Sequence, residues 1–334
     1  MGADAADAAV ALVGRGGGSV HWAAAGRTRR RGGRDVEVGD RFDLASLSKP
    51  FAATVALVLD RRRELRLSTT LGDIWGSRVD AGLADRSLEE LLRHRSGLGA
   101  WTPLYQRFRS RREAEAHLLR GTELESRRER YSDLGYILWG LSAERALGES
   151  YQSLLSRFVT SPLRLLSADG PPGSRSDVVA CRLDNSRERS LARAQGRAVA
   201  LRRGPRPGRV QDGNARFLRG PYAHAGLFAS AADVYGLARA WLSPGRLLAP
   251  SAVRRALTGG RSYALGWARA TRRGSAGPAL GPEAFGHVGF TGSSVWIDPS
   301  EDRILVLLAH RPSVAVDLSS WRRRFHRAAV ELTG

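Results

Sequence analysis

The stretch from Phe51 to Leu59 is apolar nearly all the way round a helix, and it ends at the basic cluster Arg61–Arg63. A helix without a polar face has to be buried on every side. Pro50 fits the first turn of such a helix, because its missing N–H would have no partner there anyway. We therefore expect a helix that runs through the centre of the molecule, with the rest of the chain packed around it.

The amino end of this helix carries Ser46 and Lys49. The chain has 53 Lys plus Arg residues, and Lys49 is its only lysine. A desolvated lysine can lose its proton, whereas arginine stays charged, so the two are not interchangeable where a base is needed. Residues three apart share a helix face, and a neutral amine beside a hydroxyl forms a base–nucleophile pair. The alternative is an ordinary surface lysine, left in a sequence that otherwise uses arginine for its basic residues.

Patterns typical of strands lie at both ends of the chain, with helical patterns between them. We therefore predict an α+β fold in which residues 1–65 and 225–334 form a sheet domain and residues 66–224 form a helical domain inserted between them. The sheet is expected to be antiparallel, because its strands are short and separated by turns. The predicted strands are 8–13, 19–25, 262–268, 285–290, 293–297 and 304–309.

Capping residues mark several of the predicted helices. Ser87 with Glu90 forms a capping box, Ser230 with Asp233 forms another, and Ser132 is a candidate N-cap. The predicted helices are 88–95, 107–120, 134–141, 151–159, 231–242 and an amphipathic 317–332 with Trp321, Phe325 and Val330 inward. Residues 65–75 are predicted as a loop, and the Arg-, Gly- and Pro-rich segment 170–209 as a variable, partly flexible surface segment.

Composition excludes several classes of function. The formal charge is +20, but the arginines are scattered and no zinc-finger, basic-zipper or RNA-recognition signature accompanies them, so nucleic acid is not the expected partner. Cys181 is the only cysteine, so the chain cannot form an internal disulfide. No apolar run is long enough for a membrane span. Without a visible signal peptide we expect a cytoplasmic protein, or a periplasmic one if the start is misassigned.

Two further elements could join Ser46 and Lys49. Tyr131 has a phenol with a reference pKa near 10, which a neighbouring charged lysine would lower, so that it could shuttle a proton. The segment His287–Gly292 contains glycines that allow a close approach of the backbone, and its N–H groups could stabilise an oxyanion together with the N–H of Ser46. Taken singly, Tyr131 could be a core residue and His287 an ordinary strand residue. His94 is interpreted as a capping or packing residue.

The set of motifs resembles the serine β-lactamase-related family, which includes class C β-lactamases, D-Ala carboxypeptidases and carboxylesterases of similar fold (family VIII type). The resemblance covers about residues 8–332. It implies an acyl-enzyme on Ser46, with Lys49 and Tyr131 as the base pair, no cofactor or metal, and a three-layer α/β/α domain beside an all-helical one. The motifs are Ser46–Lys49, Leu91–Leu98, Tyr131–Tyr136, His224–Phe228, Leu265–Trp267 and Gly286–Gly292.

The sequence departs from the family pattern at two positions. Class C β-lactamases carry Asn where this chain has Asp133, and a carboxylate there could pair with Lys49, repel an anionic substrate or mainly cap the helix. The family's Lys-Thr-Gly motif is replaced by His287–Gly289, which removes a cation that would hold a substrate carboxylate, although a charged histidine could partly replace it. Both changes favour the esterase-like branch.

We therefore expect a serine hydrolase that acts on small esters or amides through an acyl-enzyme. Ser46 would attack, Lys49 and Tyr131 would move protons, and Phe290 would supply the second oxyanion donor, with His287, Gly289 and Asp133 around the substrate. The alternatives are a D-Ala-type peptidase or β-lactamase, and a catalytically inactive binding or regulatory homologue. The sequence leaves the oligomeric state open.

Overall fold

The computed structural model describes residues 6–15, 17–120, 124, 126–173, 175–181, 183–200 and 207–333. A six-stranded sheet has the order β2-β1-β8-β7-β6-β5, and each neighbouring pair is antiparallel. The amino-terminal hairpin therefore pairs directly with the last strand of the chain, which confirms that both chain ends build one sheet. The strands are β1 Ala8–Arg15, β2 Val20–Gly26, β5 Ala268–Arg269, β6 Phe285–Val288, β7 Gly292–Asp298 and β8 Arg303–His310.

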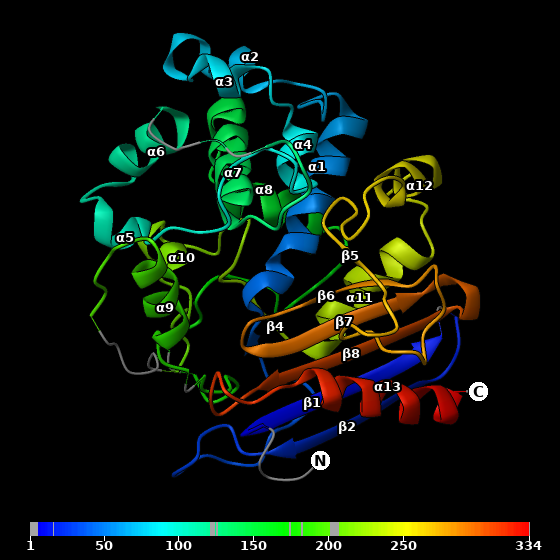
Figure 1. Ribbon diagram of the computed structural model, residues 1–334. Coiled ribbons are helices and arrows are strands. Elements are labelled where there is room, and N and C mark those ends of the chain that lie inside the picture. The colour runs from blue at the N-terminus through cyan, green and yellow to red at the C-terminus, as the bar shows by residue number, and fades with distance from the viewer. Residues whose placement is uncertain are drawn as a thin grey trace.

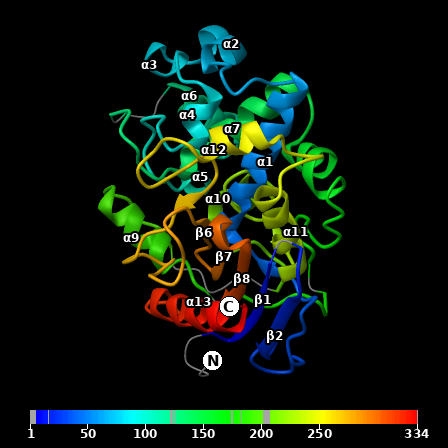
Figure 2. The same ribbon diagram turned by 90° about the vertical axis from the view of Figure 1, so that its right-hand side faces the viewer.

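Helices cover both faces of the sheet. Helix α13 (Ser319–Thr333) packs on β1 and β8 from one side, while α11 (Ala231–Leu242) packs on β1, β7 and β8 from the other. Figure 2 shows α13 and α11 on opposite sides of the strands. This is the expected three-layer α/β/α arrangement, in which β7 and β8 are buried along their whole length.

The residues between the strands form a group of helices beside the sheet (Figure 1). Ser87 and Ser132 cap α4 and α7 as predicted, and Ser230 caps α11. No helix in the described parts of the chain is both long and apolar enough to cross a membrane. The helices of this group are α2 Leu71–Trp75, α3 Ala81–Ala84, α4 Leu88–Leu92, α5 Leu104–Arg107, α6 Arg111–Arg120, α7 Asp133–Leu147, α8 Tyr151–Leu155 followed by a π turn Ser156–Thr160, α9 Ser186–Ala194 and α10 Gly213–Phe217.

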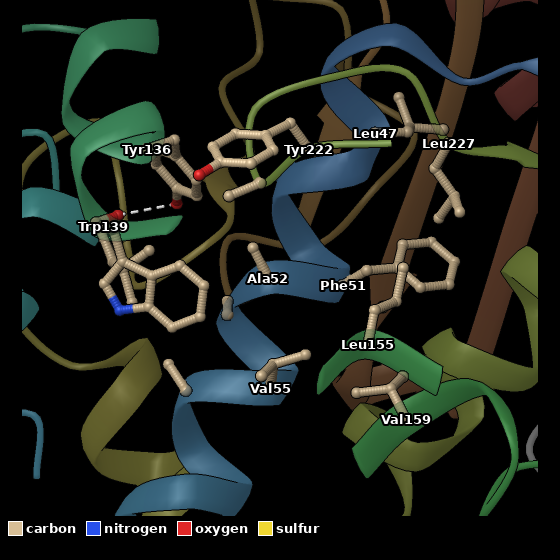
Figure 3. Packing of buried hydrophobic residues seen from close by; sticks show 14 of the residues in the cluster. Leu47, Phe51, Ala52, Val55, Tyr136, Trp139, Leu155, Val159, Tyr222 and Leu227 are labelled. Carbon is tan, nitrogen blue, oxygen red and sulfur yellow. Dashed lines mark hydrogen bonds between the residues drawn. The ribbon is translucent and has the colours of Figure 1, made fainter. Parts of the chain in front are cut away.

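Helix α1 (Ser48–Arg62) is the central helix that the apolar stretch predicts. Its residues from Ser48 to Leu59 are all buried. Figure 3 shows Phe51 and Val55 of α1 among side chains of the helical group, with Trp139 on one side and Leu155 on the other. Burying a large apolar side chain such as Phe51 contributes about 1.5–3 kcal/mol. The fixed position of α1 in this core holds its amino end rigidly.

Two local predictions are wrong. The loop predicted over 65–75 ends in helix α2, and 262–268 is not a strand, since only 268–269 pair with β6. Helix α12 (Pro250–Leu257) and helix α9, which lies within the segment 170–209, were not predicted. Residues 174, 182 and 201–206 of that segment lie outside the described part. The short helices α2 and α9 carry too few apolar residues for a periodic signal.

Helix α13 faces the sheet in part as predicted. Phe325 and Val330 pack against the apolar cluster of the sheet and are partly buried, whereas the ring of Trp321 lies under the guanidinium of Arg324. The fully buried residues of the helix are Arg322, His326 and Ala329. Arg322 is compensated by donating to the carbonyls of Gly292 and Ser293. A hydrophobicity pattern misses Arg322 and His326 on this face, because these buried polar groups find backbone partners.

Candidate active site

Ser46 lies in a tight turn at the amino end of α1. The two-residue strands β3 (Phe42–Asp43) and β4 (Phe228–Ala229) pair directly before it, and a 3-10 turn Ala45–Leu47 leads into the helix. Ala45 has a φ of +47°, a left-handed conformation that costs a non-glycine residue on the order of 1 kcal/mol. Ser48 stabilises the turn, because its Oγ donates to the Ala45 carbonyl at 2.8 Å and accepts from the Leu227 amide at 3.2 Å.

The side chain of Asp43 holds the turn that carries Ser46. Its carboxylate accepts from the amides of Ala45 at 2.9 Å and Gln211 at 2.7 Å. Burial raises the pKa of Asp43 to about 6, although these two amides act in the opposite direction. The carbonyl of Asp43 accepts from the hydroxyl of Thr291 at 2.8 Å. One residue therefore connects the nucleophile turn to the segment after β6.

Lys49 is fully buried and has three polar partners. Its Nζ lies 2.9 Å from Ser46 Oγ, 3.0 Å from the carbonyl of His224 and 2.6 Å from Asp133 Oδ1. A neutral amine has two N–H donors and one lone pair. If the donors go to His224 and Asp133, the lone pair is directed at the Ser46 hydroxyl, which is the geometry that a general base needs.

The structure decides between two of the alternatives for Asp133, pairing with Lys49 and capping of the helix. The side chain that caps α7 is Ser132, whose Oγ accepts from the Gly135 amide at 3.1 Å and donates to the Gly99 carbonyl at 2.7 Å. The Asp133 carboxylate instead forms the ion pair with Lys49. Asp133 therefore acts on Lys49 rather than on the end of the helix.

Tyr131 lies on the other side of Ser46. Its OH donates to Ser46 Oγ at 2.9 Å. Burial, and then the charge of Asp133, raise the pKa of Tyr131 well above its usual value. The expectation that Lys49 lowers this pKa is therefore wrong, because Asp133 neutralises the lysine next to the phenol. Tyr131 therefore keeps its proton in the resting site and donates it in the hydrogen bond to Ser46.

Two buried histidines flank Tyr131. The ring of His94 lies 4.6 Å from that of Tyr131, and its Nδ1 accepts from the Ser132 amide at 3.0 Å. The packing role predicted for His94 agrees with these contacts. The His287 ring lies 6.2 Å from Tyr131, and burial, then the charge of Lys49, lower the pKa of His287 to about 3. His287 is therefore neutral near pH 7 and does not replace the missing cation of the Lys-Thr-Gly motif.

The segment after β6 is held against the nucleophile turn at two points. A Cβ on Gly289 would lie only 2.6 Å from the carbonyl oxygen of Leu44, so only glycine allows this approach. Thr291 bonds to Asp43 as described above. Phe290 lies between these two anchored residues, which supports the prediction that its amide faces the same space as that of Ser46.

The neutral buried histidines give a prediction for stability. Burial lowers the pKa of His287 to about 3 and those of His310 and His326 to about 4. The unfolded chain binds protons at these groups below about pH 6.5, so the stability is fully present above that pH and is lost as pH falls. Asp43, with its raised pKa, opposes the trend between about pH 4 and 6. Guanidinium unfolding should therefore give a free energy lower by on the order of 5 kcal/mol at pH 4.5 than at pH 7.5.

The exposed His21 supplies the control for this prediction. His21→Gln should keep the full pH dependence of the wild type, whereas His310→Gln should reduce it, since His287 and His326 still contribute. A wild-type unfolding free energy that is equal at the two pH values would show that these histidines are not neutral in the folded state.

Two residues that the sequence reasoning missed complete the wall of the site. The ring of Tyr263 lies 4.8 Å from His94 and 5.6 Å from Tyr131. Glu129 holds the loop that carries Tyr263, because its carboxylate accepts from the amides of Arg261 at 3.0 Å, Ser262 at 2.7 Å and Tyr263 at 3.2 Å. Neither residue belongs to a motif, and only the folded chain brings them together.

Replacement of Glu129 tests this connection. Glu129→Ala leaves three amide donors without their acceptor and frees the loop next to Tyr131, so we expect kcat/KM for an ester to fall by about tenfold while the fold is kept. Glu301→Ala, an exposed carboxylate away from the site, is the matched control. Unchanged kcat/KM in Glu129→Ala would mean that this loop does not position Tyr131.

His224 contributes through its backbone. Its carbonyl accepts from Lys49, and its ring lies 3.1 Å from the carboxylate of Asp212, whose pKa is lowered to about 2 because His224 outweighs the effect of burial. Asp212 also caps α10. The motif that begins at His224 therefore places a backbone acceptor rather than a side chain at Lys49. In the described parts of the chain, no three His, Cys, Asp or Glu side chains gather as metal ligands would.

The fold and site can be compared with known proteins. Over 198 residues the chain is 25% identical to a protein of Escherichia coli O157:H7 named as a D-alanyl-D-alanine carboxypeptidase, covering 54% of this chain and 45% of that protein. Over 209 residues it is 28% identical to an N-acetylmuramyl-L-alanine amidase of Bacillus subtilis (strain 168), covering 56% and 45%. The chain thus spans about half the length of the curated relatives it matches.

Solved structures extend the likeness to nearly the whole fold. EstCE1, described as a hydrolase with promiscuous acyltransferase activity, superposes with a TM-score of 0.77 at 19% identity over 97% of this chain and 93% of that one. A class C β-lactamase from Rhodobacter sphaeroides gives a TM-score of 0.75 at 22% identity over 98% and 95%. The profile of the Beta-lactamase family matches residues 1–329. The chain belongs to the Beta-lactamase family.

Proposed function

We propose that this protein is a serine hydrolase that acts on small esters or amides through an acyl-enzyme on Ser46. The observation that carries the proposal is that Ser46 Oγ lies 2.9 Å from both Lys49 Nζ and the Tyr131 hydroxyl. One hydroxyl thus has a proton acceptor and a proton donor within hydrogen-bond distance. Neither a packing role nor an ordinary surface pair accounts for a fully buried lysine at this position.

The mechanism follows from these contacts. Neutral Lys49 accepts the Ser46 proton as Oγ attacks the substrate carbonyl carbon, and the amides of Ser46 and Phe290 stabilise the oxyanion, each by about 3 kcal/mol. Tyr131 donates its proton to the leaving group and is reprotonated by the Lys49 ammonium. In the second half the leaving group is replaced by water, which loses its proton along the same path, and Ser46 is released.

The strand beside the site favours neutral acyl substrates. The position of the family's motif lysine is occupied by His287, which is neutral near pH 7 because its pKa is about 3. Asp133 is paired with Lys49, the neighbour of Ser46, so it places a negative charge at the site. Since neither residue offers a cation to a substrate carboxylate, small esters are better candidates than penicillins.

One feature favours a second candidate, a peptidase that acts on substrates with a free carboxylate. A cavity of about 400 Å³ adjoins Phe290 and is lined by Arg311 and Arg322, and the Arg311 guanidinium lies 4.6 Å from the Phe290 ring centroid. An arginine there could hold the carboxylate that the missing lysine would have held. The curated relative named as a D-alanyl-D-alanine carboxypeptidase is consistent with this alternative.

A parallel assay separates the candidates. The wild-type protein is given p-nitrophenyl acetate and butyrate, nitrocefin, and an acyl-D-Ala-D-Ala peptide, with Arg311→Gln tested beside it. Ester turnover that exceeds peptide and nitrocefin turnover, and that Arg311→Gln leaves intact, supports the esterase. Peptide turnover lost in Arg311→Gln supports the peptidase. Absence of turnover on all four substrates would contradict both and favour a binding homologue.

Asp133 should set the pH dependence of the reaction. Asp133→Asn keeps a hydrogen-bond acceptor beside Lys49 but removes the negative charge that favours the ammonium form. We therefore expect the acidic limb of the kcat/KM profile for an ester to move to lower pH. Asp212 contacts the ring of His224 and not Lys49 itself. Asp212→Asn should therefore move the acidic limb less. A profile unchanged by Asp133→Asn would mean that the ion pair does not control the base.

A further inference from the structure

Strand β2 is an edge strand that the two helical layers leave exposed. It pairs with β1 on one side and forms the end of the six-stranded sheet on the other (Figure 1). Helices α11 and α13 pack on other strands, and every residue of β2 is exposed except Ala24, which is half-buried. In the described parts of the chain, β1 is the only strand that pairs with Val20–Ala25. The outer backbone groups of β2 are therefore open to a further strand.

The sequence of β2 contains none of the features that usually protect such an edge. Native proteins block exposed edges with charged side chains, proline or a β-bulge. Although 26% of the whole chain is charged, the segment Val20–Gly26 contains no Asp, Glu, Lys, Arg or Pro. Its register with β1 runs without a shift, so it has no bulge either. The small side chains of Ala23 and Ala25 leave room for the approach of another backbone.

Two large apolar side chains lie beside this open edge. Val20 is 43% exposed and Trp22 is 63% exposed, and they are two of the four large apolar side chains that are exposed in the described parts of the chain. Alternate residues of a strand point to the same face, so Val20 and Trp22 share the face on which Ala24 packs against the main core. A strand added to β2 would remove part of both side chains from water, which is favourable.

We propose that β2 is the interface of a homodimer, in which the β2 strands of two copies pair antiparallel about a two-fold axis. Such an edge is self-complementary, because antiparallel pairing matches its N–H donors with the same set of acceptors on the second copy. The sheets of the two copies form one continuous sheet, and the two Trp22 side chains lie close to each other near the axis. This interface does not depend on the proposed hydrolysis.

The other edge of the sheet favours a closed dimer over an open chain of copies. That edge is β5, which has only two residues, and Ala268 of β5 already forms a bridge with Tyr263. A head-to-tail contact would have to pair β2 with this short edge. The long open edge that β2 can pair with is therefore β2 of a second copy, which uses up both edges and ends the assembly at two chains.

The charges next to β2 favour the antiparallel arrangement. The strand leads into a loop with the exposed residues Arg30 and Arg31, whereas the turn 17–19 before the strand is uncharged. Arg15, which precedes this turn, donates to the carbonyl of Thr333. Antiparallel pairing places the arginine loop of one copy beside the uncharged turn of the other. Parallel pairing brings the two arginine loops together, and repulsion between like charges disfavours it.

Size-exclusion chromatography with light scattering on the full chain tests the proposal. A protein concentration of about 0.1 mM is suitable, because an interface built on one strand is small and weak. We expect the wild type to have twice the 36.2 kDa mass of one chain. Trp22→Lys brings two charges together near the axis and should have the mass of one chain. Leu166→Lys, which replaces another exposed apolar side chain, is the matched control and should remain a dimer.

A cross-link locates the interface without changing Trp22. The only native cysteine, Cys181, is buried, so Ala23→Cys supplies the one accessible thiol of its chain. A short bismaleimide should join two Ala23→Cys chains and should not join two Leu166→Cys chains. If circular dichroism shows that Trp22→Lys is unfolded, this cross-link decides alone.

Three results would overturn the proposal. The first is a wild type with the mass of one chain, and the second is an assembly larger than two chains. The third is a dimer that folded Trp22→Lys leaves intact and that Ala23→Cys does not cross-link, because its interface would then lie elsewhere on the molecule.

Discussion

Ser46→Ala should lower the turnover of a p-nitrophenyl ester by a factor on the order of 10⁴ or more, with the unfolding temperature unchanged. Ser46 Oγ contacts only groups that belong to the proposed chemistry, Lys49 and Tyr131, so its removal leaves the turn and helix α1 intact. The hydrogen bonds that hold the turn come from Ser48 and Asp43 instead. Loss of activity without loss of stability would show that Ser46 acts in the reaction and not in the fold.

Steady-state ester hydrolysis and a thermal melt on the same samples check this result. Ser19→Ala, in the exposed turn between β1 and β2, is the matched control and should retain wild-type turnover. If Ser46→Ala kept more than about a tenth of the wild-type rate, an acyl-enzyme on Ser46 could not be the main route, because nucleophile loss costs far more than tenfold.

Lys49→Arg should lower the turnover of the ester by a factor on the order of 10³ although the positive charge is kept, because arginine cannot act as a base. The Asp133 carboxylate would still be paired, so the site keeps its ion pair and the fold should survive. The larger guanidinium in a fully buried position costs about 1–3 kcal/mol of stability. The variant should therefore remain folded, less stable and inactive.

Circular dichroism, a guanidinium titration and the ester assay together check this second prediction. The reverse control is Arg157→Lys on the exposed surface, which should change neither stability nor rate. Substantial ester hydrolysis by folded Lys49→Arg would mean that the amine is not the base, and a different group would have to accept the Ser46 proton.

The main features of the fold could be predicted from the sequence because strong patterns encode them. The apolar stretch from Phe51 to Leu59 required a central helix, and capping residues such as Ser132 and Ser230 marked helix starts that the structure confirms. Short helices such as α9 could not be predicted in this way. They are set by tertiary contacts, among them the hydroxyl of Tyr105 that bonds to Glu188 of α9.

The candidate site was predictable at its motifs and not beyond them. The structure brings Ser46, Lys49, Tyr131 and Asp133 together at hydrogen-bond distances, as their spacing in the motifs suggested. The direction of the Tyr131 pKa shift was predicted wrongly, because burial and the charge of Asp133 raise this pKa. A charged His287 is not found, because burial and the charge of Lys49 both lower its pKa. Neither effect can be read from a linear pattern. Residues that act through loops, such as Glu129, carry no local signal.

The most direct test is the site of covalent labelling by a fluorophosphonate, which traps an activated serine. The wild-type protein is labelled, digested and examined by mass spectrometry, with Ser46→Ala treated in parallel. The adduct should be found on the peptide that contains Ser46 and should be absent from Ser46→Ala. An adduct on another residue, or equal labelling of the two proteins, would contradict the assignment of Ser46 as the nucleophile.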